Sequence, residues 1–228
     1  MSLLMSSTID LDNPDTVKVQ IDGQGELASL CKTICRDDFI RLLSRKDDGV
    51  VKTRIPRLPQ GTVDVAWANK DNYSISIFVP AEKRPTAYMR EENSHLLPYP
   101  NLLFYFEVGQ GVMLTSRVFA VRDNYRAIGE DTELCYFPYG NVYSDGKICW
   151  GSNDSIANLK DGVKGLERVI GVFFNGIMNN DLYSRDKTRY QKDSLERLLS
   201  DMVLLDSFPA EMLSGTGHDY RFFGFGDE

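Results

Sequence analysis

Residues 137–151 read Phe-Pro-Tyr-Gly-Asn-Val-Tyr-Ser-Asp-Gly-Lys-Ile-Cys-Trp-Gly. The Asp-Gly pair at 145–146 indicates a tight turn, since glycine readily adopts the positive φ angles that many turns require. A cysteine, Cys149, follows the turn closely and lies eight positions after Asn141. The surrounding residues 123–162 are rich in Gly, Asn, Asp and Ser and show little periodicity. Because long segments of this kind in compact domains are often functional, we expect the chemistry of the protein to lie here.

The residues that precede this segment predict an antiparallel sheet. Four runs have the alternation or the apolar composition of strands and are separated by turn-forming residues, at 63–67, 73–79, 102–108 and 112–121. Strands joined by short turns pair as antiparallel neighbours, so these runs predict a four-stranded meander that a loop at 81–101 interrupts. A shorter alternating run at Thr16–Ile21 predicts one more strand.

Helices are predicted on both sides of the sheet-forming region. Between 26 and 46, apolar residues at helical spacing predict an N-terminal helix that begins with Leu27, Leu30, Cys31 and Ile34. Apolar positions three and four residues apart predict two further helices, over 166–178 and 195–203. Helices at the two ends with strands between them indicate an α+β fold and not alternating βαβ units.

The length of 228 residues fits one domain with additions at its ends. We expect an N-terminal extension over 1–25, made of a tail and the short strand. A main domain over 26–205 would follow it, and a C-terminal tail over 206–228 would end the chain.

The composition excludes several classes of function. With 26 basic and 33 acidic residues the formal net charge is −7, which argues against broad binding to nucleic acid or to anionic membranes. The sequence has no apolar run of the roughly 20 residues that span a bilayer and no signal-peptide pattern, so we expect a cytoplasmic protein. Four cysteines are too few for a disulfide scaffold. The absence of a metal-ligand set and of a phosphate-binding glycine loop predicts no metal and no cofactor.

The segment 137–151 resembles the active-site segment of ubiquitin-conjugating enzymes. That family has a His-Pro-Asn motif, then an apolar residue, a turn that ends in Gly, one variable residue, Ile or Val, and the catalytic Cys. The family's Asn precedes its Cys by eight positions, as Asn141 precedes Cys149 here. Val142, Gly146 and Ile148 match in register as well.

The resemblance extends over residues 26–205, because the predicted order of helix, strands, Cys segment and helices is that of the family. More narrowly, the chain resembles prokaryotic family D of this superfamily, whose members include PRTRC system protein B. The shared segments are Leu58-Pro59, Val79-Pro80-Ala81, and 141–151 with its Asn-Val-Tyr start and Cys-Trp-Gly end. The chain departs from the superfamily at Tyr139-Gly140, where His-Pro would stand, and at Trp150, where Leu is usual.

The resemblance implies a function. Residues 26–205 would be a bacterial ubiquitin-conjugating-like (UBC-like) catalytic domain, an acyltransferase that carries a ubiquitin-like protein as a thioester on Cys149. It would pass this protein to a nucleophile, usually an amine, on a protein or small-molecule acceptor. The partners implied are the ubiquitin-like protein and an adenylating, ThiF-like activating enzyme.

The same resemblance assigns roles to four residues. Cys149 is the nucleophile, and because the incoming thioester is already activated, no strong base beside it is required. The Asn141 carboxamide can donate to the oxyanion of the tetrahedral intermediate or hold the loop, and the sequence leaves both roles open. Tyr139 and Gly146 are predicted to shape the loop.

Two alternatives belong to other functional classes. The first is a non-catalytic UBC-like module that only binds a ubiquitin-like protein, although such variants typically lack the Cys. The second is a Cys hydrolase, which needs His95 or His218, the two histidines of the chain, beside Cys149.

Overall fold

The computed structural model describes residues 4–9, 16–22, 30–35, 57–69, 71–89, 94–151, 159 and 161–224. The described strands form three antiparallel sheets, with six, three and two strands. The described helices are α2 (Gly165–Phe174), α3 (Leu195–Met202) and five short 3₁₀ helices, η1 (Tyr125–Ala127), η3 (Gly162–Lys164), η4 (Arg185–Lys187), η5 (Ala210–Met212) and η6 (Tyr220–Phe223).

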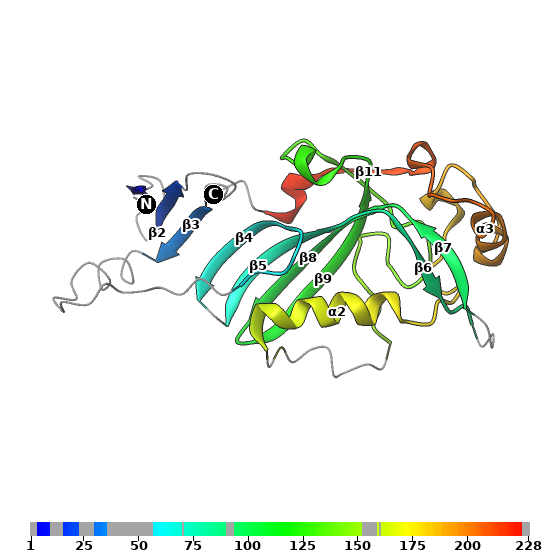
Figure 1. Ribbon diagram of the computed structural model, residues 1–228, viewed down its shortest axis with the longest axis horizontal. Helices are drawn as coiled ribbons and strands as arrows, with labels where there is room; N and C mark the ends of the chain where they lie inside the picture. The colour runs from blue at the N-terminus through cyan, green and yellow to red at the C-terminus, as the bar shows by residue number, and fades with distance from the viewer. Residues whose placement is uncertain are drawn as a thin grey trace.

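The six-stranded sheet is the centre of the fold (Figure 1). Its spatial order is β11-β10-β9-β8-β5-β4. The bounds are β4 (Thr62–Asn69), β5 (Asn72–Val79), β8 (Asn101–Gly109), β9 (Val112–Val121), β10 (Glu133–Cys135) and β11 (Gly215–Asp219). The four strands predicted from the sequence therefore lie side by side, but β10 and β11 extend the sheet beyond them. The predicted loop at 81–101 contains a further pair, β6 (Glu82–Thr86) with β7 (His95–Tyr99).

The central strand β8 is buried on both faces, which explains its continuous apolar run. Leu102, Phe104 and Phe106 belong to the main core, which includes residues of α2 and α3. Leu103 and Tyr105 alternate with them and face a second core, which includes Tyr220 and Phe223. Figure 1 shows α2 crossing one face of the sheet, with the C-terminal residues on the opposite side.

The two predicted C-terminal helices are confirmed, with a shift at one end. Ser194 caps α3, since its Oγ accepts a hydrogen bond from the Arg197 amide. The helix predicted over 166–178 ends at Phe174, because Asn175 and Gly176 form the turn that stops it. The backbone after Gly176 is therefore not part of the helix and can form hydrogen bonds with other segments.

The predicted N-terminal helix is wrong at residues 30–35. Leu30–Cys35 is the strand β3, which pairs with β2 (Thr16–Asp22) in register Ile21↔Leu30. The strand β2 contains the one predicted at Thr16–Ile21, and β1 (Leu4–Ile9) pairs with its other edge. Apolar residues four apart fit a strand as well as a helix, and pairing with β2 decides between the two. The rest of the predicted helix lies outside the described residues.

The segment expected as a C-terminal tail is folded onto the sheet as far as residue 224. β11 pairs with β10, and the Ser76 and Tyr220 hydroxyls share a 2.5 Å hydrogen bond across the second core. The Phe223 ring stacks on Tyr105 with ring centroids 4.8 Å apart. The sequence signal was weak, because this segment is rich in glycine and lacks strand alternation.

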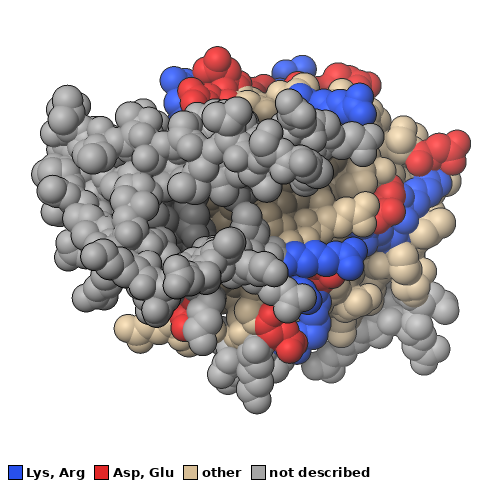
Figure 2. Space-filling view, turned by 60° about the vertical axis from the view of Figure 1, so that its left-hand side comes forward, with Lys and Arg blue, Asp and Glu red and all other residues tan. Residues whose placement is uncertain are grey.

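Acidic and basic side chains are mixed over the described part of the surface in Figure 2. Several form ion pairs, including Lys83 with Asp206 and Arg122 with Glu133. Within the residues that the structure describes, every helix is too short or too polar to reach across a bilayer.

Replacing Phe223 by Ala tests whether the C-terminal segment is part of the fold. Phe223 is 5% exposed, and removing a buried Phe side chain typically costs about 3–5 kcal/mol. We expect Phe223→Ala to lower the free energy of unfolding by about 3 kcal/mol, measured by urea denaturation. Phe222→Ala is the matched control, because its ring is 37% exposed and its loss should cost about 1 kcal/mol. Equal, small losses for both variants would contradict this packing.

Candidate active site

Cys149 and Asn141 are cross-strand neighbours in a short hairpin. The Cys149 amide donates to the Asn141 carbonyl at 2.9 Å, Val142 bridges to Ile148, and the Tyr143 amide donates to the Lys147 carbonyl at 2.9 Å. In antiparallel pairing each step forward on one strand is a step back on the other. The eight-residue spacing in the sequence therefore places the two residues directly opposite each other.

The turn of this hairpin requires a glycine at position 146. The Gly146 amide donates to the Tyr143 carbonyl, and the Asp145 carboxylate accepts from the Lys147 amide. Gly146 has φ +81°, and a Cβ atom there would lie 2.3 Å from Cζ of Phe119. Both the backbone angle and the aromatic ring beneath the turn exclude a side chain.

The hairpin is joined to the edge of β9 by main-chain hydrogen bonds. The Val118 amide donates to the Gly146 carbonyl at 2.9 Å, and the Ile148 amide donates to the Ser116 carbonyl at 3.0 Å. Ser116 also accepts from the Trp150 indole N–H through its Oγ at 2.9 Å. The sheet therefore positions the second strand of the hairpin, which carries Cys149.

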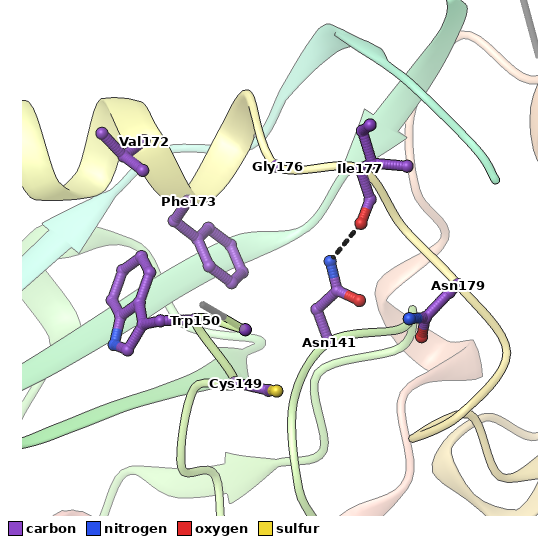
Figure 3. Close-up of a pocket in the computed structure, with 9 residues that line it drawn as sticks. Asn141, Cys149, Trp150, Val172, Phe173, Gly176, Ile177 and Asn179 are labelled. Atoms are coloured by element: carbon purple, nitrogen blue, oxygen red, sulfur yellow. Dashed lines mark hydrogen bonds between the residues drawn. The ribbon is translucent and has the colours of Figure 1, made fainter. Parts of the chain in front are cut away.

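Asn141 connects the first strand of the hairpin to the residues after α2. Its φ of +63° is in the left-handed region, which Asn tolerates better than most residues. Its Nδ2 donates to the Ile177 carbonyl at 2.8 Å, as Figure 3 shows. This carbonyl is available because α2 ends at Phe174.

Lys187 makes a second connection, which the sequence did not reveal. Its Nζ donates to the Val142 carbonyl at 2.5 Å and to the Leu182 carbonyl at 2.6 Å. The residue is 4% exposed, and burial lowers the pKa of its ammonium group to about 8. The sequence gives no sign of this connection, because a lysine in a polar segment is typical of a solvated surface.

Tyr139 leads into the hairpin from the main core. Its ring is fully buried, and its hydroxyl donates to the Pro98 carbonyl at 2.5 Å. The Tyr99 and Phe208 rings contact it edge to face. Burial raises the pKa of the phenol well above its usual value, so Tyr139 stays protonated and acts here as a packed, hydrogen-bonded anchor.

Cys149 is half-buried and lies between two hollows. The narrower one has a volume of about 180 Å³, and its lining side chains carry no charge. They are Asn141, Cys149, Trp150, Val172, Phe173, Ile177 and Asn179, with the backbone of Gly151 and Gly176 (Figure 3). The wider hollow, of about 620 Å³, is lined by residues 143–145 and 147–151. Cys149 thus contributes to the lining of both hollows.

The other chemically active side chains lie elsewhere. Cys135 is buried in β10, and burial raises the pKa of its thiol to about 11. Both histidines are within the described residues, and neither lines a hollow beside Cys149: His95 lies on β7 and His218 stacks on Phe222. In the described part of the chain, no group of three or more His, Cys, Asp or Glu side chains could hold a metal ion.

A comparison with known families identifies the family of this chain. Residues 50–216, well over half of the chain, match prokaryotic E2 family D, E2 being the class of ubiquitin-conjugating proteins. The chain therefore belongs to prokaryotic E2 family D, as the motif around Cys149 predicted. This membership indicates a role of the ubiquitin-conjugating type, and in general an interaction with a ubiquitin-like protein and an activating enzyme. No curated protein and no solved structure matches the chain.

Replacing Gly146 by Ala tests the turn of the hairpin. A side chain in the left-handed region costs about 1–2 kcal/mol, and forcing a methyl group against a packed ring adds about 1–3 kcal/mol. We expect Gly146→Ala to lower the free energy of unfolding by about 3 kcal/mol in a urea titration.

Gly217→Ala is the control for this variant. Gly217 has a similar φ of +84°, but a Cβ atom there meets nothing within 4 Å. It should therefore lose only about 1 kcal/mol, the cost of the backbone strain alone. Equal losses in the two variants would show that Phe119 does not restrict the turn.

Proposed function

We propose that this protein carries a ubiquitin-like protein as a thioester on Cys149 and transfers it to an amine. The observation that carries the proposal is the position of the Cys149 thiol. It is accessible between two hollows, on a hairpin that places it opposite Asn141. Family membership supplies the reaction class, and this geometry supplies a nucleophile that an extended protein terminus can reach.

The loading step is a thioester exchange. The Cys149 thiolate attacks the carbonyl carbon of the thioester that joins the ubiquitin-like protein to the activating enzyme. A new C–S bond forms through a tetrahedral oxyanion, and the thiolate of the activating enzyme leaves. Because the leaving and attacking groups are both thiolates, the step needs no imidazole base, which agrees with the finding that neither His95 nor His218 lines a hollow beside Cys149.

The discharge step consumes this thioester. A neutral amine of the acceptor attacks the same carbonyl carbon, a C–N bond forms, and the C–S bond to Cys149 breaks. The amine loses one proton and the departing thiolate of Cys149 can accept one, so the products are an amide and a free thiol.

The two hollows fit the two substrates of this step. The narrower hollow has an uncharged lining with two carboxamides, which suits the extended, uncharged end of the donor protein. The wider hollow is also lined by Cys149, together with Asp145 and Lys147, and leaves room for the acceptor.

Formation of a thioester is the direct test. The protein is mixed with its cognate ubiquitin-like protein, the activating enzyme and ATP, and analysed on a non-reducing gel. We expect an adduct that a thiol reductant removes, no adduct for Cys149→Ala, and a more stable oxyester for Cys149→Ser. Cys135→Ala is the matched control and should keep the adduct, because that thiol is buried in the core. Binding of the ubiquitin-like protein without an adduct would instead favour the non-catalytic binding module.

The role of Asn141 is tested by Asn141→Gly, which removes the carboxamide without straining the positive φ. Its bond to the Ile177 carbonyl favours a loop-holding role, so we expect loading and discharge to slow together, by about tenfold to a hundredfold. Single-turnover rates of both steps measure this. Gln191→Gly is the control, since Gln191 also has a positive φ but does not line a hollow beside Cys149. A loss of about 10²–10³ in discharge with a much smaller loss in loading would assign Asn141 to the oxyanion of the transfer step instead.

A further inference from the structure

The hairpin that carries Cys149 has a main-chain carbonyl that its own pairing cannot satisfy. Asn141 pairs with Cys149 and Tyr143 pairs with Lys147 by hydrogen bonds, which makes Val142 and Ile148 a non-hydrogen-bonded pair. The Val142 carbonyl therefore points away from the hairpin. A buried carbonyl without a partner costs free energy comparable to that of a lost hydrogen bond, so the fold must supply a donor.

Lys187 supplies this donor, although burying its ammonium group costs free energy. Its Nζ reaches the Val142 and Leu182 carbonyls, both main-chain atoms, from a side chain that is 4% exposed. Removing an ammonium group from water is costly, and the lowered pKa of Lys187 reflects that cost. A methionine would fill the same space without this desolvation cost. The hydrogen bonds therefore explain the presence of a lysine at position 187 better than packing does.

Three contacts join the segment 176–187 to consecutive residues of the first hairpin strand. The Asn141 carboxamide is bonded to the Ile177 carbonyl, and Lys187 is bonded to Val142. Gly140 lies so close to the Asn179 carbonyl that a Cβ atom would be 2.5 Å from it. The second strand is fixed by β9, so this segment is what positions the first strand.

We infer that Lys187 is a positioning residue for the thioester site: by holding the Val142 carbonyl, its ammonium group fixes the hairpin 141–149 against the segment 176–187. Its effect on transfer rests on the proposed function, whereas its effect on the order of the hairpin does not. The two can therefore be measured separately.

The experiment compares Lys187→Met with the wild-type protein by residue-resolved amide hydrogen exchange. We expect the amides of Tyr143 and Cys149, which close the hairpin, to exchange at least tenfold faster in the variant, while the amides of β8 keep their protection. Discharge of the thioester to a free amine should slow by about tenfold, because small displacements of reacting groups are costly in rate. Lys192→Met is the matched control and should change neither quantity, since the Lys192 ammonium group is paired with Asp201.

Each outcome bears on the inference. Wild-type protection of the Tyr143 and Cys149 amides in Lys187→Met would overturn it. Loss of that protection in a protein whose wild type forms no thioester would keep the positioning role and refute the proposed function. Lys187→Gln retains an N–H donor, on a side chain one bond shorter, and should restore part of the protection. If Lys187→Met and Lys187→Gln both lose protection equally in β8 and in the hairpin, Lys187 supports the whole fold and the inference fails.

Discussion

The hydrogen bond from the Cys149 amide to the Asn141 carbonyl is the constraint on which the site depends. It fixes the register of the hairpin, and the register explains why the two residues are eight positions apart. It also requires a tight turn between them, which only a glycine over the Phe119 ring can complete. Since β9 pairs with the second strand through Ser116 and Val118, the geometry around the thiol is inherited from the central sheet.

The contacts of the first hairpin strand come from the irregular backbone after α2. Holding such backbone in one conformation costs free energy. The helix α2 stops at Phe174, four residues before Met178, where its apolar spacing would have taken it, and this early end exposes the Ile177 carbonyl to Asn141. Lys187 enters from a short 3₁₀ helix and gives up most of its solvation for two carbonyls. Regular helices and strands satisfy their own backbone carbonyls and need no buried side-chain donor. The buried ammonium group of Lys187 therefore indicates that the fold maintains a particular loop conformation here.

The sequence predicted the parts of this protein that have a strong local signal. The strands β4, β5, β8 and β9 and the helix at 195–202 follow from periodicity and turn residues, whereas β6 and β7 were expected to be a loop. The family was indicated by the resemblance of the segment from Asn141 to Cys149. Residues 30–35 were misassigned because their apolar positions fit two periods, and β10 and β11 were missed because each is short and gains its stability from a partner distant in sequence. Lys187 could not have been found, since burial of a lysine depends on contacts that no local pattern encodes.

The contrast between two cysteines shows what the fold selects. Cys135 lies in the sheet, where burial raises the pKa of its thiol to about 11, so hardly any thiolate forms at neutral pH and no partner can reach the sulfur. Cys149 lies on the second strand of the hairpin, half-buried, and lines two hollows. A protease would need a histidine beside such a thiol to activate it against an amide. A thioester, the electrophile of the proposed reaction, is far more reactive than an amide, so a half-buried thiol on a well-positioned backbone would suffice for it, and no imidazole lines either hollow beside Cys149.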